Sequence, residues 1–143
     1  MTTFVLVRHA EKGTDDARDP SLSEAGRARA IRLAQLLSGR PLTAAYATAY
    51  RRTLQTAQPA AEAHGVTVTT YDAQMPAAEF ASQLRSNHAQ GTVLVVGHSN
   101  TIPELAAALS ATATTEMRED EFDRLYRVSI GRDGKAVLSQ DTY

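Results

Sequence analysis

Cysteine is absent from this chain of 143 residues. Disulfides, thiolate metal sites and a cysteine nucleophile are therefore excluded. Long apolar runs are also absent near the start: only four apolar residues follow Met1–Thr3, and no basic segment precedes them. The sequence thus predicts neither a signal peptide nor a bilayer-spanning segment, and a cytoplasmic location is expected.

An excess of either charge is likewise missing. The chain carries 15 basic and 16 acidic residues, for a net charge of −1. Such a balance offers no general attraction to nucleic acid or to a membrane surface, so we expect neither as a partner. The composition is 43% hydrophobic and 22% charged. This is ordinary for a globular domain with a core, and the length predicts one domain over residues 1–143.

Two short apolar strands are each followed by a histidine. Phe4–Val7 leads into Arg8 and His9, and Val93–Val96 leads into Gly97 and His98. A single Arg-His pair could be a strand cap beside a solvated arginine. The recurrence of the pattern favours a functional interpretation, because the carboxyl ends of strands line the ligand crevice of open α/β sheets.

Between these strands, apolar periodicity alternates between helix and strand. Helices are predicted over 25–37, 50–64, 77–88 and 101–109, and strands over 42–47, 66–71 and 92–96. Ser23 and Thr48 are expected helix caps, as is Thr101 in a capping box with Glu104. Residues 125–130 and 135–139 flank Asp133-Gly134 as a hairpin. The pattern predicts an α/β three-layer sandwich around a mostly parallel sheet, whose strand order cannot be read from the sequence.

The residues expected at the strand ends share an affinity for phosphate. Planar guanidinium groups suit phosphate oxygens, and Arg8 and the pair Arg51-Arg52 supply them. One neutral imidazole can attack phosphorus, and a second can stabilise charge in the transition state. His9 and His98 are the candidates for these two roles.

Four motifs in order carry a family resemblance: Leu6-Val7-Arg8-His9-Ala10-Glu11, Leu22-Ser23-Glu24-Ala25-Gly26, Arg52-Thr53-Leu54-Gln55-Thr56-Ala57 and Gly97-His98-Ser99-Asn100-Thr101. From Phe4 to about Leu109 the chain resembles the histidine phosphatase superfamily, in its phosphoglycerate mutase-like branch. The resemblance implies that His9 is the nucleophile and forms a phosphohistidine. It also implies that Arg8 and Arg52 bind phosphate and that His98 is the electrostatic partner. Arg51 is then a surface or rim residue.

One feature of the family has no clear counterpart. Many members carry a Glu or Asp after the third strand that protonates the leaving oxygen. Here Asp72 is the favoured candidate, with Glu79 and Glu11 as alternatives. Without a well-placed acid, the substrate would need a good leaving group, such as the imidazole of phosphohistidine. Small members resembling protein phosphohistidine phosphatases are of this kind.

These observations predict a cofactor-independent phosphatase acting on a phosphorylated small molecule or a phosphohistidine protein. No metal is expected, because the four histidines lack a metal-binding spacing. A phosphomutase and a catalytically silent phospho-ligand binding module are the alternatives. The short chain suits an open pocket rather than a mutase site. The acidic run from Glu119 to Asp123 is interpreted as a solvated helix face.

Overall fold

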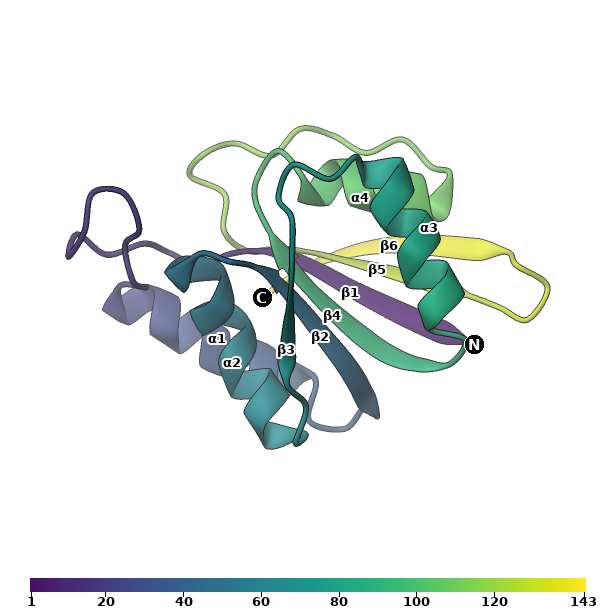
Figure 1. The fold of residues 1–143 in the computed structure, drawn as a ribbon, viewed down its shortest axis with the longest axis horizontal. Helices are drawn as coiled ribbons and strands as arrows, with labels where there is room; N and C mark the ends of the chain where they lie inside the picture. Colours follow the sequence, from purple (N-terminus) through teal and green to yellow (C-terminus); the bar gives the residue numbers. More distant parts are fainter.

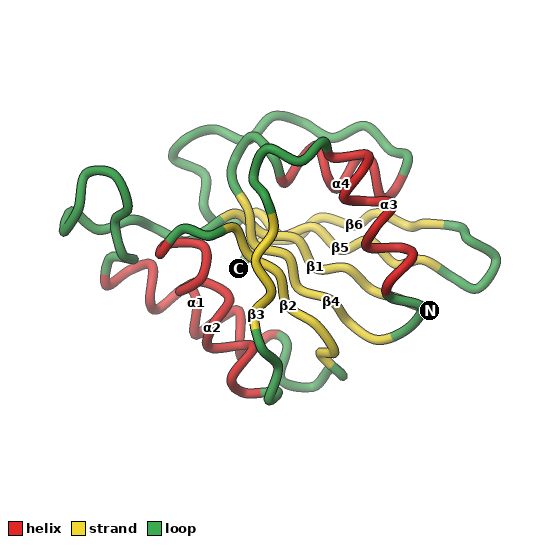
Figure 2. The backbone as a smooth tube through the Cα atoms, viewed as in Figure 1, coloured by secondary structure: helices red, strands yellow, loops and turns green.

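The computed structural model describes residues 1–143. Its ten elements alternate between strand and helix before a final pair of strands (Figures 1 and 2). In chain order they are β1 (Thr2–Arg8), α1 (Glu24–Leu36), β2 (Leu42–Thr48), α2 (Arg51–Ala63), β3 (Val68–Tyr71), α3 (Ala77–Asn87), β4 (Gly91–Gly97), α4 (Ile102–Ser110), β5 (Arg124–Ile130) and β6 (Ala136–Thr142).

The six strands form one mixed sheet in the order β3-β2-β4-β1-β5-β6. The four strands from β3 to β1 are parallel, while β5 and β6 are antiparallel to their neighbours. The predicted mostly parallel sheet and the C-terminal hairpin are therefore confirmed. β1 and β4 lie at the centre, which explains why both read as continuous apolar runs.

Helices cover both faces of the sheet (Figure 1). Along β1, Phe4 and Leu6 join a core cluster with α3 and α4, while Val5 and Val7 join a second cluster with α1 and α2. The alternation follows from the period of two along a strand. The structure confirms the predicted three-layer sandwich. No helix is both long and apolar enough to cross a membrane.

Two helix starts differ from the sequence prediction. Ser23 caps α1 as expected, accepting the Gly26 N–H at 3.1 Å. Thr48 does not cap α2, whose N-cap is Tyr50 without a side-chain hydrogen bond. Thr101 caps α4 without the expected capping box; instead its hydroxyl accepts the His98 N–H at 3.0 Å. Both threonine hydroxyls contact His98: Thr101 accepts its backbone N–H, and Thr48 lies 2.8 Å from its Nε2 while also bonding Thr53 of α2.

Candidate active site

The strand order brings the two histidines together. Arg8 and Gly97 are register partners at the carboxyl ends of the adjacent strands β1 and β4. The His9 N–H donates to the Gly97 carbonyl at 2.9 Å, which continues the pairing past the last strand residue. As a result, the imidazole rings of His9 and His98 lie edge to face, with centroids 5.5 Å apart.

His9 is held with one ring nitrogen free. Its side chain is buried, with the residue only 4% exposed. Nδ1 lies 2.9 Å from the carbonyl oxygen of Ala10, which can only accept, so Nδ1 carries the proton of the neutral ring. Nε2 has no partner in the protein, and its lone pair is therefore available to an electrophile.

The segment after His9 is anchored by the second turn of α2. Thr56 Oγ1 accepts the Ala10 N–H at 2.9 Å, and Gln55 Oε1 accepts the Leu22 N–H at 2.8 Å. The motif from Arg52 to Ala57 therefore has two tasks. Gln55 and Thr56 hold the loops that surround His9, while Arg52 lies one turn earlier at the start of the same helix.

Arg8 is buried beneath the loop between α4 and β5. Nη1 donates to the carbonyl oxygens of Glu119 and Glu121, both at 2.8 Å. The guanidinium carbon lies 4.0 Å from the centroid of the Phe122 ring. The backbone carbonyls and the aromatic ring therefore orient the guanidinium group. Its Nε is buried without an acceptor, so part of its hydrogen-bonding capacity stays unused.

Arg51 and Arg52 have different partners. Arg51 forms an exposed ion pair with Asp15 at 3.4 Å, and its backbone N–H donates to Asp19 at 2.9 Å. Arg52 stacks on Tyr50, with its guanidinium carbon 4.5 Å from the ring centroid, and its buried Nε has no acceptor. Neither a carboxylate nor a carbonyl of the protein pairs with the Arg52 side chain.

Both histidines are neutral at pH 7 in this environment. Burial, together with the positive charges of Arg8 and Arg52, lowers the pKa of His9 to about 3. Burial and the same two arginines lower the pKa of His98 to about 4. The two rings contact each other, Phe122 lies against both Arg8 and His9, and Tyr50 lies against both Arg52 and His98. The site therefore combines an unpaired imidazole nitrogen with positive charge.

The three candidate acids have partners or positions other than the two histidines. Glu11 forms a two-pronged ion pair with Arg29, at 2.9 and 3.1 Å. Asp72 is exposed, and its carboxylate accepts the Gln74 N–H at 2.8 Å. It follows β3, the edge strand, which three strand spacings, roughly 14 Å, separate from β1. Glu79 is exposed in the first turn of α3. None of the three has a hydrogen bond or an ion pair with either histidine.

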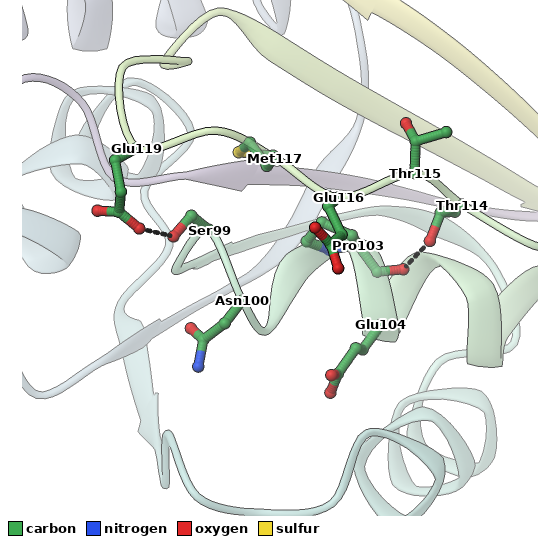
Figure 3. A pocket seen from close by; sticks show the side chains of 9 residues that line it. All are labelled: Ser99, Asn100, Pro103, Glu104, Thr114, Thr115, Glu116, Met117 and Glu119. Atoms are coloured by element: carbon green, nitrogen blue, oxygen red, sulfur yellow. Dashed lines mark hydrogen bonds between the residues drawn. The ribbon is translucent and has the colours of Figure 1, made fainter.

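The acidic run from Glu119 to Asp123 is the clearest error of the sequence interpretation. It forms a loop rather than a solvated helix face, and it lies against Arg8. The Glu119 carboxylate accepts the Ser99 hydroxyl at 3.1 Å and lies 3.7 Å from Arg8 Nη2, although its side chain is 88% exposed. Figure 3 shows the hydrogen bond between Ser99 and Glu119 at one end of an open pocket that Glu104 and Glu116 also line. Sequence spacing could not reveal a contact across 111 residues.

The aromatic residues beside the site were also missed. Phe122 stacks on Arg8 and lies 6.1 Å from His9 between ring centroids. Tyr50 contacts both Arg52 and His98. The only local signal was the position of Tyr50 directly before the arginine pair. No group of three or more His, Cys, Asp or Glu side chains is arranged to hold a metal ion.

Fold and site together define an α/β enzyme with paired histidines and arginines at the carboxyl end of a parallel sheet. The family model of the histidine phosphatase superfamily (branch 1) matches residues 4–75, half of the chain. The protein therefore belongs to this superfamily and is a phosphatase of the histidine phosphatase type.

Solved structures agree with this fold. The protein histidine phosphatase SixA complexed with tungstate is 18% identical, with a TM-score of 0.77 over 98% of this chain and 96% of that chain. Phosphoserine phosphatase from Entamoeba histolytica, in complex with 3-phosphoglyceric acid, is 17% identical, with a TM-score of 0.76 over 100% and 98%. A putative phosphohistidine phosphatase SixA from Nakamurella multipartitia is 25% identical, with a TM-score of 0.68 over 98% and 95%. A sequence search of curated proteins finds no match.

Proposed function

We propose that the protein hydrolyses phosphate monoesters or phosphohistidine through a covalent phosphohistidine on His9. The observation that carries this proposal is the free Nε2 of a neutral, buried His9 beside two arginines whose Nε atoms lack acceptors. Arg52 has no acidic partner, and Arg8 has only the exposed carboxylate of Glu119, so the two guanidinium groups favour a phosphate dianion. A nucleophile fixed beside it reduces the entropic cost of attack.

The reaction has two steps. In the first, His9 Nε2 forms a bond to phosphorus, and the bond from phosphorus to the leaving oxygen or nitrogen breaks. In the second, water attacks the phosphohistidine, which releases inorganic phosphate and restores the neutral imidazole. Arg8, Arg52 and His98 stabilise the charge on the non-bridging oxygens in both transition states.

The leaving group narrows the substrate class. An alkoxide needs a proton at neutral pH, yet Asp72, Glu79 and Glu11 make no contact with the histidines. A phosphorylated imidazole or an acidic alcohol departs more easily. This supports phosphohistidine proteins and activated esters as substrates. The likeness to proteins described as SixA is consistent with the same class.

The direct test is to trap the intermediate. Acid-labile, base-stable phosphate should appear on the wild-type protein within one turnover of phosphohistidine peptide or 4-nitrophenyl phosphate. His9→Ala should lack both the label and the activity. His64→Ala is the matched control, because His64 lies at the end of α2 and contacts the Leu37 carbonyl. Substantial activity in His9→Ala would refute the mechanism.

The phosphomutase alternative predicts a different product. A mutase returns the phosphoryl group to a monophosphorylated sugar or glycerate, whereas the proposed hydrolase transfers it to water. Product analysis with such an acceptor present separates the two activities. A catalytically silent module would give neither product.

A further inference from the structure

A chain of buried hydroxyls runs from His98 into the start of α2. Thr48 Oγ1 lies 2.8 Å from Nε2 of His98 and 2.9 Å from Thr53 Oγ1. Thr53 Oγ1 in turn lies 2.7 Å from the Thr48 carbonyl and 2.9 Å from the Tyr50 carbonyl. The two threonines are at most 1% exposed, so water does not compete for these hydrogen bonds.

The carbonyl oxygens determine the direction of donation along this chain. Each hydroxyl has one proton, and a carbonyl oxygen can only accept. The proton of Thr53 must therefore point to a carbonyl, which leaves its oxygen as the acceptor for Thr48. The Thr48 hydroxyl then donates its hydrogen bond to Thr53, so the Thr48 oxygen must accept a hydrogen bond from Nε2–H of His98.

We propose that Thr48, backed by Thr53, is a positioning residue that holds His98 in the Nε2–H tautomer and presents Nδ1 to the phosphoryl group. Nδ1 of His98 has no partner in the protein, whereas Nε2 is committed to Thr48. The two free ring nitrogens of the site are thus Nε2 of His9 and Nδ1 of His98. This proposal rests on the proposed function for its catalytic consequence, but the tautomer itself does not depend on activity.

Anion binding then has a defined effect on His98. With Nε2 protonated, Nδ1 of the neutral ring offers only a lone pair, which repels phosphate oxygens. His98 must take up one proton at Nδ1 to donate to them. The charged and titratable groups facing His98 are Arg8, Arg52, His9 and Tyr50. The arginines oppose protonation in the free protein, and a phosphate dianion between them reverses that field.

Removing the Thr48 hydroxyl should lower activity about as much as removing any residue that hydrogen-bonds a catalytic imidazole without touching the substrate. Such partners fix the tautomer and the ring orientation, and their loss costs roughly ten- to a hundredfold in activity. Thr48→Val keeps the shape of the side chain and removes the two hydrogen bonds of its hydroxyl, to His98 and to Thr53. Its kcat should fall at least about tenfold with a smaller change in KM. Thr48→Ser restores the hydroxyl and should recover most of the activity.

The decisive measurement is nitrogen-15 NMR of the histidine side chains. At pH 7, His98 of the free wild-type protein should be protonated at Nε2 and unprotonated at Nδ1. Saturating inorganic phosphate should protonate Nδ1 as well. Thr48→Val should lose the preference for Nε2–H, and its pH profile should shift. Thr43→Val is the matched control, since Thr43 lies at the opposite end of β2.

Two results would overturn the proposal. One is the finding that His98 of the free wild-type protein is protonated at Nδ1 rather than at Nε2. This measurement needs no variant, so it does not depend on whether a variant folds. The other is a folded Thr48→Val with unchanged tautomer and unchanged kcat. Neither result tests the covalent intermediate, because the test of the intermediate is the trapping of phosphate on His9.

Discussion

Replacing Arg52 by alanine should separate the phosphate site from the surface beside it. Arg51 and Arg52 are neighbours in the first turn of α2, and their side chains leave the helix about 100° apart. Arg51 is committed to the loop before α1 through Asp15 and Asp19. Arg52 has no such partner. The same substitution at adjacent positions should therefore affect different properties.

The magnitude follows from these contacts. Loss of a guanidinium contact that strengthens in the transition state should cost on the order of 3 kcal/mol, or roughly a hundredfold in kcat/KM. The ion pair of Arg51 with Asp15 joins two side chains that are each 47% exposed. An ion pair that exposed contributes about 0–1 kcal/mol to stability. Arg51→Ala should therefore leave kcat/KM almost unchanged.

Stability should respond in the opposite sense to activity. Arg52 has a buried Nε without an acceptor, and its charge adds to the effect of burial in lowering the pKa of Arg8. Arg52→Ala should thus keep or raise the melting temperature while activity falls. Arg52→Lys retains the charge but loses the planar guanidinium with its paired N–H donors. Its activity should therefore lie between that of Arg52→Ala and that of the wild type.

Steady-state kinetics on 4-nitrophenyl phosphate, with thermal unfolding by circular dichroism, measures both quantities. Inhibition by inorganic phosphate gives an independent measure of anion binding. If Arg51→Ala reduces kcat/KM more than Arg52→Ala, with both proteins folded, then the assignment of the phosphate site is wrong.

Three further outcomes are expected. Gly26→Ala should lower the free energy of unfolding in urea by about 1–3 kcal/mol, because an added Cβ would lie 2.2 Å from the Glu11 carbonyl oxygen, while Gly39→Ala, with open space around it, should not. The free energy of unfolding should fall as the pH drops from about 6.5 towards 3, by up to about 2.7 kcal/mol per pH unit, because His9 and His98 take up protons in the unfolded chain but stay neutral when buried. His9→Ala should make this dependence shallower, and a flat wild-type profile would contradict the pKa values. Activity should survive exhaustive EDTA treatment, and a loss that added Mg²⁺ or Zn²⁺ reverses would contradict a metal-independent mechanism.

Local patterns were sufficient to predict most elements of the fold. The apolar runs before His9 and His98 predicted the two central strands, because a strand covered on both faces carries apolar side chains on both faces. Ser23 predicted the start of α1, because an N-cap interaction spans only three residues. The Asp133-Gly134 turn predicted the hairpin for the same reason.

The site could be predicted only in part. Motifs near strand ends predict His9, Arg8, Arg52 and His98 as site residues, and the structure places these four side chains in one cluster. Asp72 was favoured as an acid because it follows a strand. That strand lies at the sheet edge, and no property of the segment itself records its place in the sheet.

By itself, the sequence determined which segments are strands and helices, and which side chains stand where the strands end. These features depend on interactions over a few residues, such as side-chain periodicity, capping and turn geometry. The tertiary structure alone decided the strand order and, with it, the distance between the two histidines. It also placed the Glu119–Asp123 loop on Arg8 and committed Thr48 to His98. Such contacts join residues far apart in the chain, so they exist only once the sheet has assembled and its two faces are covered.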